Sequence, residues 1–404
     1  MTENKTGICI LITNAFLRDW TGSELYIRDV AMELIKRGHK PIVYSPRLGE
    51  LADELRKKSI PVIKDLNSIS VKPDLIHGQH HLETMTALAQ FPSTPVVFFC
   101  HGWLPWEETP PLHPRIIQYV TVSHAVRDRL IYEYGIPNEK ISTILNSVDL
   151  ERFKSRPVLP DIPKRALVFN NQANEANILG IIREACASNG MVVDSMGYTS
   201  GNPSFDPESQ LGKYDIIFAV GRAALESLAI GATVICCSVE GVGQMVTTQN
   251  MEWMRHNNFG IRILNRPLTV DNLSAEIQRY DPLDALKVSQ EIRATAKLSD
   301  MVDQILDVYA SVLSTWAVTP KPDPIAESLA FSNYLKGISE KIDQGNLWIE
   351  KARILQGELN IIKQGLMWRV YRRLASISLL HYLYIKLKAP IWRWRAHLNN
   401  KDES

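Results

Sequence analysis

The chain of 404 residues is too long for one hydrophobic core, and its length predicts two domains with a further segment. Its net charge of +1 gives no overall indication of nucleic-acid binding. Five cysteines lie in or beside apolar runs without CxxC or metal-ligand spacing, which indicates reduced core residues of a cytosolic protein. Residues 8–13 are too short an apolar stretch for a signal peptide, and no stretch reaches the ~18 uncharged apolar residues of a spanning helix.

Short apolar runs alternate with amphipathic segments of helix length, which is typical of a parallel α/β protein. In the first half we predict strands at residues 8–13, 41–44, 61–63, 74–77, 96–99 and 118–122, and helices at 24–36, 48–58, 82–90 and 124–134. In the second half we predict strands at residues 166–170, 191–194, 215–220, 233–237 and 260–264, and helices at 175–188, 223–229, 270–279, 286–297 and 301–313.

Two proline-rich segments divide this pattern, because proline stiffens the chain and cannot continue a central strand. They lie at residues 157–163 and 320–324. The sequence therefore predicts an N-terminal domain at 1–160, a C-terminal domain at 161–319 and a helical extension at 320–404. Each domain is expected to be a Rossmann-like, doubly wound sheet, and a ligand is expected at the carboxyl ends of the strands.

The apolar residues 214–220 predict a strand, and the run from Gly221 to Ile235 directly after it indicates a glycine turn, a short helix, another glycine and another strand. Arg222 lies at the start of the helix, where free N–H groups and the helix dipole favour an anion such as a phosphate. Glu226 falls one turn later on the same face, suited to a ribose diol. A solvated Arg222–Glu226 pair on an ordinary crossover helix explains the run equally well.

Several motifs resemble those of the family 4 glycosyltransferases, which have the GT-B fold. The first half contains Thr21-Gly22-Ser23-Glu24, the His-ended runs 74–77 and 97–101, and the string 120–153 with Asn146-Ser147-Val148-Asp149. In the second half, residues 226–235 are similar to the family's "EAmAxGxPVI" segment. The resemblance covers about residues 7 to 315. It implies a GT-B-like α/β fold with two Rossmann-like domains facing a cleft, a nucleotide-sugar donor, retention of configuration and no metal cofactor.

The resemblance also implies roles for particular residues. His101 is the predicted catalytic residue, since the matching histidine contacts the donor sugar; the alternative is a strand-end histidine satisfied by backbone. The donor is expected to bind to Glu226, Arg222, Gly221, Gly243 and Asn170. Gly22 and Ser23 are predicted to form an acceptor or phosphate loop, although Gly22 also suits a simple turn and Ser23 a helix N-cap. His77, His80 and His81 are crowded, but no cysteine or acidic cluster accompanies them, so we expect no metal site.

Departures from the family lie in the second half. Phe218 stands where the family has the first of two glutamates, and Asn170-Asn171-Gln172-Ala173-Asn174 replaces the segment that supplies an arginine and a lysine to the diphosphate. These losses support an alternative, a catalytically silent GT-B-like protein that binds glycan or scaffolds a membrane-surface assembly. An epimerase on the same fold is a third possibility, but it needs acid and base carboxylates for which no convincing pair stands out.

The C-terminal part of the chain differs in composition from the two predicted domains. Residues 326–364 have mixed charge and predict helices, in a helical hairpin or a coiled coil. From Lys363 onward there are nine Lys or Arg against two acids, and residues 366–395 interleave tryptophan and tyrosine with arginine. This pattern favours an anionic membrane surface over a helix packed on the protein's own core or on a partner, and no nucleic-acid recognition motif accompanies it. We therefore predict a glycosyltransferase on the cytoplasmic face of the inner membrane that acts on a surface-glycan or lipid-linked acceptor.

Overall fold

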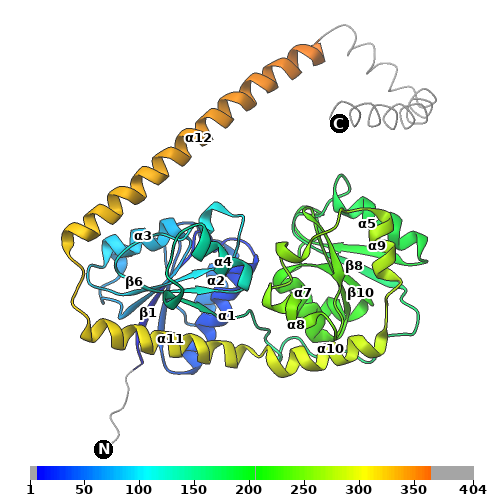
Figure 1. Cartoon of the computed structure of the whole chain (residues 1–404), viewed down its shortest axis with the longest axis horizontal. Helices are drawn as coiled ribbons and strands as arrows, with labels where there is room; N and C mark the ends of the chain where they lie inside the picture. Colours follow the sequence, from blue (N-terminus) through cyan, green and yellow to red (C-terminus); the bar gives the residue numbers. More distant parts are fainter. Residues whose placement is uncertain (1–6, 205, 365–404) are drawn as a thin grey trace, which may run out of the picture. The chain divides into compact units, whose positions relative to one another are not determined.

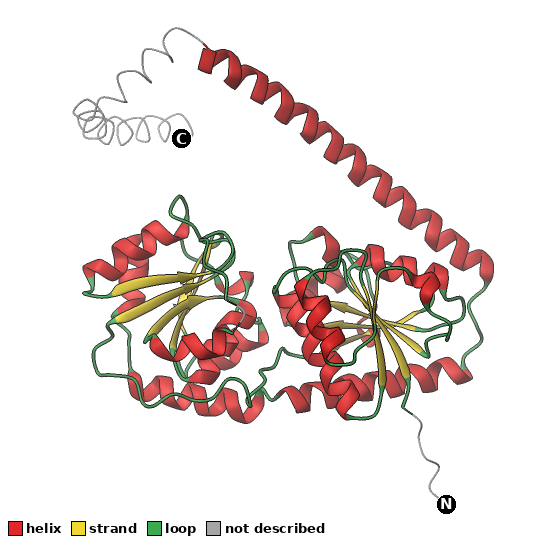
Figure 2. Ribbon diagram, turned by 180° about the vertical axis from the view of Figure 1, so that it is seen from behind, coloured by secondary structure: helices red, strands yellow, loops and turns green. Residues whose placement is uncertain are grey.

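The computed structural model describes residues 7–204 and 206–364. The chain divides into two compact units, residues 1–330 and 331–404, and each is described by itself. The first unit contains two sheets, both flanked by helices on either face (Figures 1 and 2). This confirms the predicted α/β class with two doubly wound sheets. Residues 366–395, to which the membrane contact was ascribed, lie outside the described residues.

The first sheet is parallel throughout and has the order β3-β2-β1-β4-β5-β6-β7. Its strands are β1 (Cys9–Thr13), β2 (Lys40–Tyr44), β3 (Val62–Ile63), β4 (Leu75–Gln79), β5 (Val96–Cys100), β6 (Ile116–Thr121) and β7 (Ile141–Thr143). The helices between them are α1 (Gly22–Lys36), α2 (Glu50–Lys57), α3 (His81–Gln90) and α4 (His124–Tyr132). The strand order reverses between β1 and β4, which is where open α/β sheets bind ligands.

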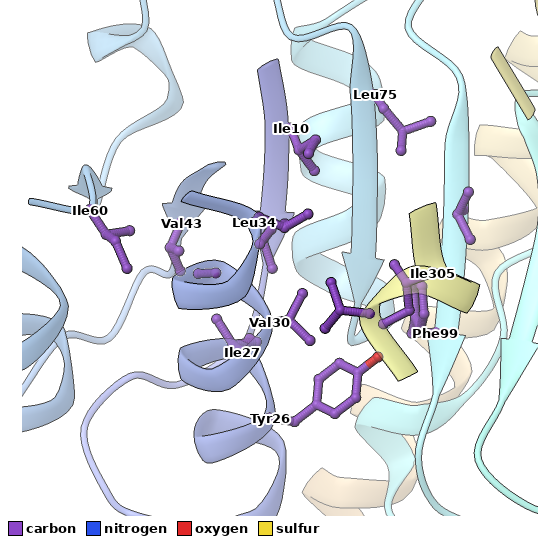
Figure 3. Packing of buried hydrophobic residues seen from close by; sticks show 14 of the residues in the cluster. Ile10, Tyr26, Ile27, Val30, Leu34, Val43, Ile60, Leu75, Phe99 and Ile305 are labelled. Atoms are coloured by element: carbon purple, nitrogen blue, oxygen red, sulfur yellow. The ribbon is translucent and has the colours of Figure 1, made fainter. Parts of the chain in front are cut away.

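The core of this sheet follows from the spacing along α1. Tyr26, Val30 and Leu34 recur on one helical face and are buried against the sheet (Figure 3). Phe99 of β5 and Ile305, from far along the sequence, pack into the same cluster.

The second sheet has the order β12-β11-β10-β8-β9. Its strands are β8 (Arg165–Phe169), β9 (Val192–Met196), β10 (Ile216–Ala219), β11 (Thr233–Ser238) and β12 (Gly241–Met245), and its helices are α5 (Ile178–Ser188), α6 (Pro207–Gln210), α7 (Gly221–Ile230), α8 (Met251–His256), α9 (Val270–Ile277) and α10 (Pro282–Thr295). β12 runs antiparallel to β11 and was not predicted as a strand.

The strand predicted at residues 260–264 is wrong, because Ile261–Ile263 forms a 3₁₀ turn. Asn258 and Phe259 have φ values of 54° and 48°, in the left-handed region. Two such residues in succession turn the chain sharply before the apolar run, so the run cannot extend beside β12.

Helix α11 (Leu298–Val318) follows the second sheet in sequence but packs on the first. Its buried side chains belong to the core cluster of the first sheet, namely Met301, Val302, Ile305, Tyr309 and Val312. The Tyr309 hydroxyl hydrogen-bonds Nδ1 of His77, a fully buried residue of β4. The first sheet therefore takes part of its core from the far end of the unit, while the domain limits at 160 and 319 stay a prediction.

Helix α12 (Pro324–Gln364) is continuous over 41 residues, so the helical hairpin predicted within residues 326–364 is wrong. Many of its large apolar side chains are exposed, among them Leu335, Ile342 and Trp348. Among the described residues, no helix combines the length and apolar character required to span a membrane.

Candidate functional site

Three adjoining hollows lie where β5, β8 and the first turns of α1 and α7 meet. The first hollow, of about 220 Å³, is lined by residues that include Phe169, Tyr198 and Glu226. The second, of about 390 Å³, includes Gly221 and Asn257. The third, of about 520 Å³, contains residues from the start of α1, namely Gly22, Ser23 and Glu24. Shared wall residues connect the hollows into one cleft between the two sheets: Asn170 joins the first and second, His101 the second and third, and Arg222 the first and third.

The loop before α1 is organised by a single carboxylate. Glu24 Oε1 accepts from the backbone N–H groups of Arg18 and Asp19, both at 2.9 Å, and Oε2 accepts from the N–H and hydroxyl of Thr21 at 3.1 and 2.6 Å. Thr21 is the N-cap, so the N-cap alternative for Ser23 is wrong. Gly22 lines the first and third hollows and Ser23 the third, which brings both predicted loop residues into the cleft.

His101 directly follows β5 and lines the second and third hollows. Its backbone N–H donates to Glu108 Oε2 at 2.7 Å, and its ring meets Tyr26 edge-on with ring centres 4.5 Å apart. Within the described part of the chain, Nε2 has no hydrogen-bond partner. Burial, assisted by nearby His80 and opposed by Glu108, lowers the pKa of His101 to about 4. The imidazole at the cleft is therefore neutral near pH 7.

His80 and Glu108 form a buried pair behind His101. His80 Nδ1 accepts from the Ala15 N–H at 3.0 Å, while its Nε2 lies 3.7 Å from Glu108 Oε1. Burial disfavours the charged imidazole, but Glu108 outweighs this effect and raises the pKa of His80. Sequence reasoning missed Glu108, because it ends a short 3₁₀ turn (Trp106–Glu108) whose place beside β5 has no local signature.

Arg222 and Glu226 are buried, so the interpretation of them as a solvated pair is wrong. Their side chains are 14% and 4% exposed, and Arg222 Nε donates to Glu226 Oε1 at 2.6 Å. Arg222 Nη2 donates to Asp29 Oδ2, from α1 beside the first sheet. Asp29 is 5% exposed and accepts at Oδ1 from both Nε and Nη2 of Arg28, at 2.9 and 2.8 Å. Burial alone would raise the pKa of Asp29, but the two guanidinium groups outweigh it and lower that pKa. The predicted phosphate ligand is thus already bound to two carboxylates.

Of the remaining predicted donor residues, Asn170 and Gly221 line the cleft and Gly243 does not. Asn170 follows β8 and lines two hollows, and Gly221 starts α7 with φ of +58° and donates its N–H to the Phe259 carbonyl at 3.1 Å. Gly243 lies inside β12 and does not line any of the three hollows; its carbonyl accepts from Arg266 Nη2 at 2.5 Å. Asn257, which sequence reasoning left without a role, lines the second hollow, and its buried Oδ1 has no partner among the described residues.

Comparison with known proteins identifies the fold and the family resemblance. Residues 20–152 match the family described as Glycosyltransferase Family 4. The chain is a GT-B protein whose residues 20–152 are similar to this family. The match ends before the second sheet, the half in which the GT-B protein departs from the family's motifs. No curated protein matches the sequence significantly.

Solved structures agree on the GT-B fold. A glycosyltransferase from Rickettsia africae ESF-5 has 15% identity and a TM-score of 0.57, with 76% of this chain and 99% of that chain covered. Alr3699/HepE from Anabaena, in complex with UDP and glucose, has 16% identity and a TM-score of 0.57, with 75% and 100% covered. The family match and the fold together support a sugar transferase.

Proposed function

We propose that this GT-B protein transfers a sugar from a nucleotide-sugar to a hydroxyl of a surface-glycan or lipid-linked acceptor, with retention of configuration. The observation that carries the proposal is the continuous cleft, in which Glu226, Arg222, Asn170 and His101 line connected hollows at the ends of both sheets. The solved structure of Alr3699/HepE with UDP and glucose has the same fold.

The first hollow suits the nucleoside. Phe169, Met196 and Tyr198 supply apolar and aromatic surface for a base. Glu226 Oε1 accepts a hydrogen bond from Arg222, whereas Oε2 accepts none among the described residues. Oε2 is therefore left to accept from a ribose hydroxyl. The diphosphate would then lie near the start of α7, where the helix dipole favours negative charge.

The second hollow suits the sugar, because uncharged polar groups line it. The neutral imidazole of His101 and the amide of Asn170 offer hydrogen bonds to sugar hydroxyls without requiring a counter-charge. In the proposed step the acceptor oxygen bonds to the anomeric carbon, the bond from that carbon to the diphosphate breaks, and the acceptor proton leaves with the nucleoside diphosphate. Hydrogen bonds placed around the developing charge are the main catalytic contribution of such a site.

The charges in the cleft favour a second candidate, a catalytically silent glycan-binding or scaffold protein. Every arginine that lines the three hollows is paired with a carboxylate: Arg18 with Asp19, Arg28 and Arg222 with Asp29, and Arg152 with Glu208. A leaving diphosphate therefore meets little uncompensated positive charge. Binding of a nucleotide-sugar distinguishes the two candidate functions, because only the transferase requires it.

We further propose that residues 366–395 bring the enzyme to an anionic membrane, on the cytoplasmic face. The support is compositional, since arginines there alternate with tryptophan and tyrosine, and each cation near an anionic surface contributes about 1 kcal/mol. Such a location suits a lipid-linked acceptor. Co-sedimentation of the full chain with phosphatidylglycerol vesicles, but not with phosphatidylcholine vesicles, is the expected result.

Donor binding tests the catalytic proposal. Isothermal calorimetry on the full chain with UDP-, GDP-, ADP- and CMP-linked sugars should give saturable binding for one base. Glu226→Ala should weaken it at least tenfold, whereas Glu184→Ala, which removes an exposed carboxylate of α5, should leave it unchanged. If folded protein binds none of the four, the donor site is disproved and the silent candidate replaces it.

A further inference from the structure

A buried network of four charges joins the two halves of the first unit. Arg28 and Asp29 come from α1, which packs on the first sheet, whereas Arg222 and Glu226 come from α7, which packs on the second. Arg28, Asp29 and Glu226 are at most 5% exposed and Arg222 is 14% exposed. Each half contributes one cation and one anion, so the network is neutral, and the Arg222–Asp29 ion pair joins its two halves.

The guanidinium of Arg222 is fixed from two directions. Nε donates to Glu226 on its own helix, and Nη2 donates to Asp29 on the opposite half. Because the fork is planar and rigid, its two carboxylate partners determine its orientation. Arg222 in turn occupies Oε1 of Glu226 and leaves Oε2 without a hydrogen bond among the described residues.

Removing one partner of a buried pair leaves an uncompensated charge, which is strongly destabilising. Without the Asp29 carboxylate, the Arg222 guanidinium is expected to turn toward water or toward Glu226 alone. Either movement changes the oxygen that Glu226 presents to the first hollow. The opposite half therefore determines the geometry of a residue that lines the nucleoside hollow.

We infer that Asp29 is a positioning residue of the donor site: it holds Arg222, and through Arg222 it holds Glu226 and keeps the cleft closed. The predicted effect on nucleotide-sugar binding rests on the proposed function. The predicted effect of Asp29 on closure of the cleft does not depend on it. Through Asp29, the half that contains the first sheet, which would bind the acceptor, directly affects the affinity for the donor.

Another ion pair across the same cleft supplies a matched control. Arg262 and Asp128 join the second half to α4 at 2.8 Å, with 37% and 40% exposure, and neither lines the three hollows. Solvent-exposed pairs of this kind contribute little. Asp128→Asn removes a cross-cleft carboxylate by the same chemical change as Asp29→Asn, without touching Glu226.

The experiment uses the full chain with two measurements. Spin labels at Lys58→Cys, the exposed C-cap of α2, and at Glu184→Cys, an exposed site on α5, report the distance across the cleft without ligand, in a background carrying Cys9→Ser. Asp29→Asn should lengthen or broaden that distance, and Asp128→Asn should not. Calorimetry with the nucleotide-sugar that binds wild type should show at least tenfold weaker binding for Asp29→Asn, no change for Asp128→Asn and partial recovery for Asp29→Glu.

An unchanged distance and unchanged affinity in folded Asp29→Asn would overturn the inference, as would equal effects of Asp29→Asn and Asp128→Asn. Absence of nucleotide binding by wild type would instead disprove the proposed function, and the spin-label distance would still decide whether Asp29 holds the cleft closed. Circular dichroism of each variant separates these outcomes from unfolding.

Discussion

At His101, burial keeps a neutral imidazole against the cleft. The pKa of about 4 in the folded protein lies below the ordinary value of 6.5. Between these pH values the unfolded chain binds more protons than the folded protein, so stability falls as the pH is lowered through this range. The same neutral ring is the form proposed to contact the sugar, so its hydrogen-bonding role does not depend on titration near pH 7.

We therefore expect the free energy of unfolding to decrease between pH 6.5 and pH 4 more for wild type than for His101→Gln. The difference should be on the order of 1–3 kcal/mol. Urea unfolding at several pH values measures it. Parallel pH profiles for the two proteins would show that His101 titrates normally in the fold.

On the scale of single elements, the start of α1 depends on Glu24. Glu24→Ala removes the acceptor for three backbone N–H groups and one hydroxyl, so we expect a loss of about 2 kcal/mol in the free energy of unfolding. Urea denaturation provides the measurement. Glu50→Ala, in the exposed first turn of α2, is the control and should change stability by less than about 0.5 kcal/mol. Equal losses in both variants would contradict the capping role.

Helix α12 offers a second test at this scale. Gly345 lies in its exposed interior, where a Cβ would meet nothing within 4 Å. Gly345→Ala should stabilise the helix locally by about 1 kcal/mol and slow amide hydrogen exchange near residue 345 about fivefold. Ala352→Gly is the converse variant and should accelerate exchange. No difference between the two variants would mean that factors other than helix propensity control the opening of α12.

At the scale of the whole first unit, α11 connects the far end of the sequence to the first sheet. Tyr309→Phe deletes the hydroxyl that pairs with the buried His77, so we expect the free energy of unfolding to drop by about 1–3 kcal/mol. Tyr280→Phe is the matched control, because its hydroxyl donates to the Pro160 carbonyl at an exposed position. Thermal unfolding of both variants compares them, and a loss no larger for Tyr309→Phe would argue against this contact as a support of the core.

Most of the fold could be predicted because its strands and helices are local patterns. Apolar runs marked nearly every strand, and glycines and caps marked the turns. The strand at residues 241–245 was not predicted, because its two glycines give a low strand propensity. A strand was wrongly predicted at residues 260–264, because the left-handed turn at Asn258 and Phe259 has no strong sequence signal.

The site was predictable only within each half. Gly221, Arg222 and Glu226 form one turn of helix, so their proximity follows from spacing. The partner of Arg222 does not, because Asp29 lies 193 positions away and comes near only through tertiary structure. The same holds for Ile305 and Tyr309: the helix that carries them could be predicted from the sequence, but its packing on the first sheet could not.

The return of α11 has a consequence for synthesis on the ribosome. The last strand of the first sheet ends at Thr143, whereas the helix that covers its core begins at Leu298. At roughly 5–20 residues per second, about 8–30 s separate the two. During that interval the nascent sheet leaves the surface destined for Val302 and Ile305 uncovered, and a fragment that stops at residue 160 would keep it uncovered permanently.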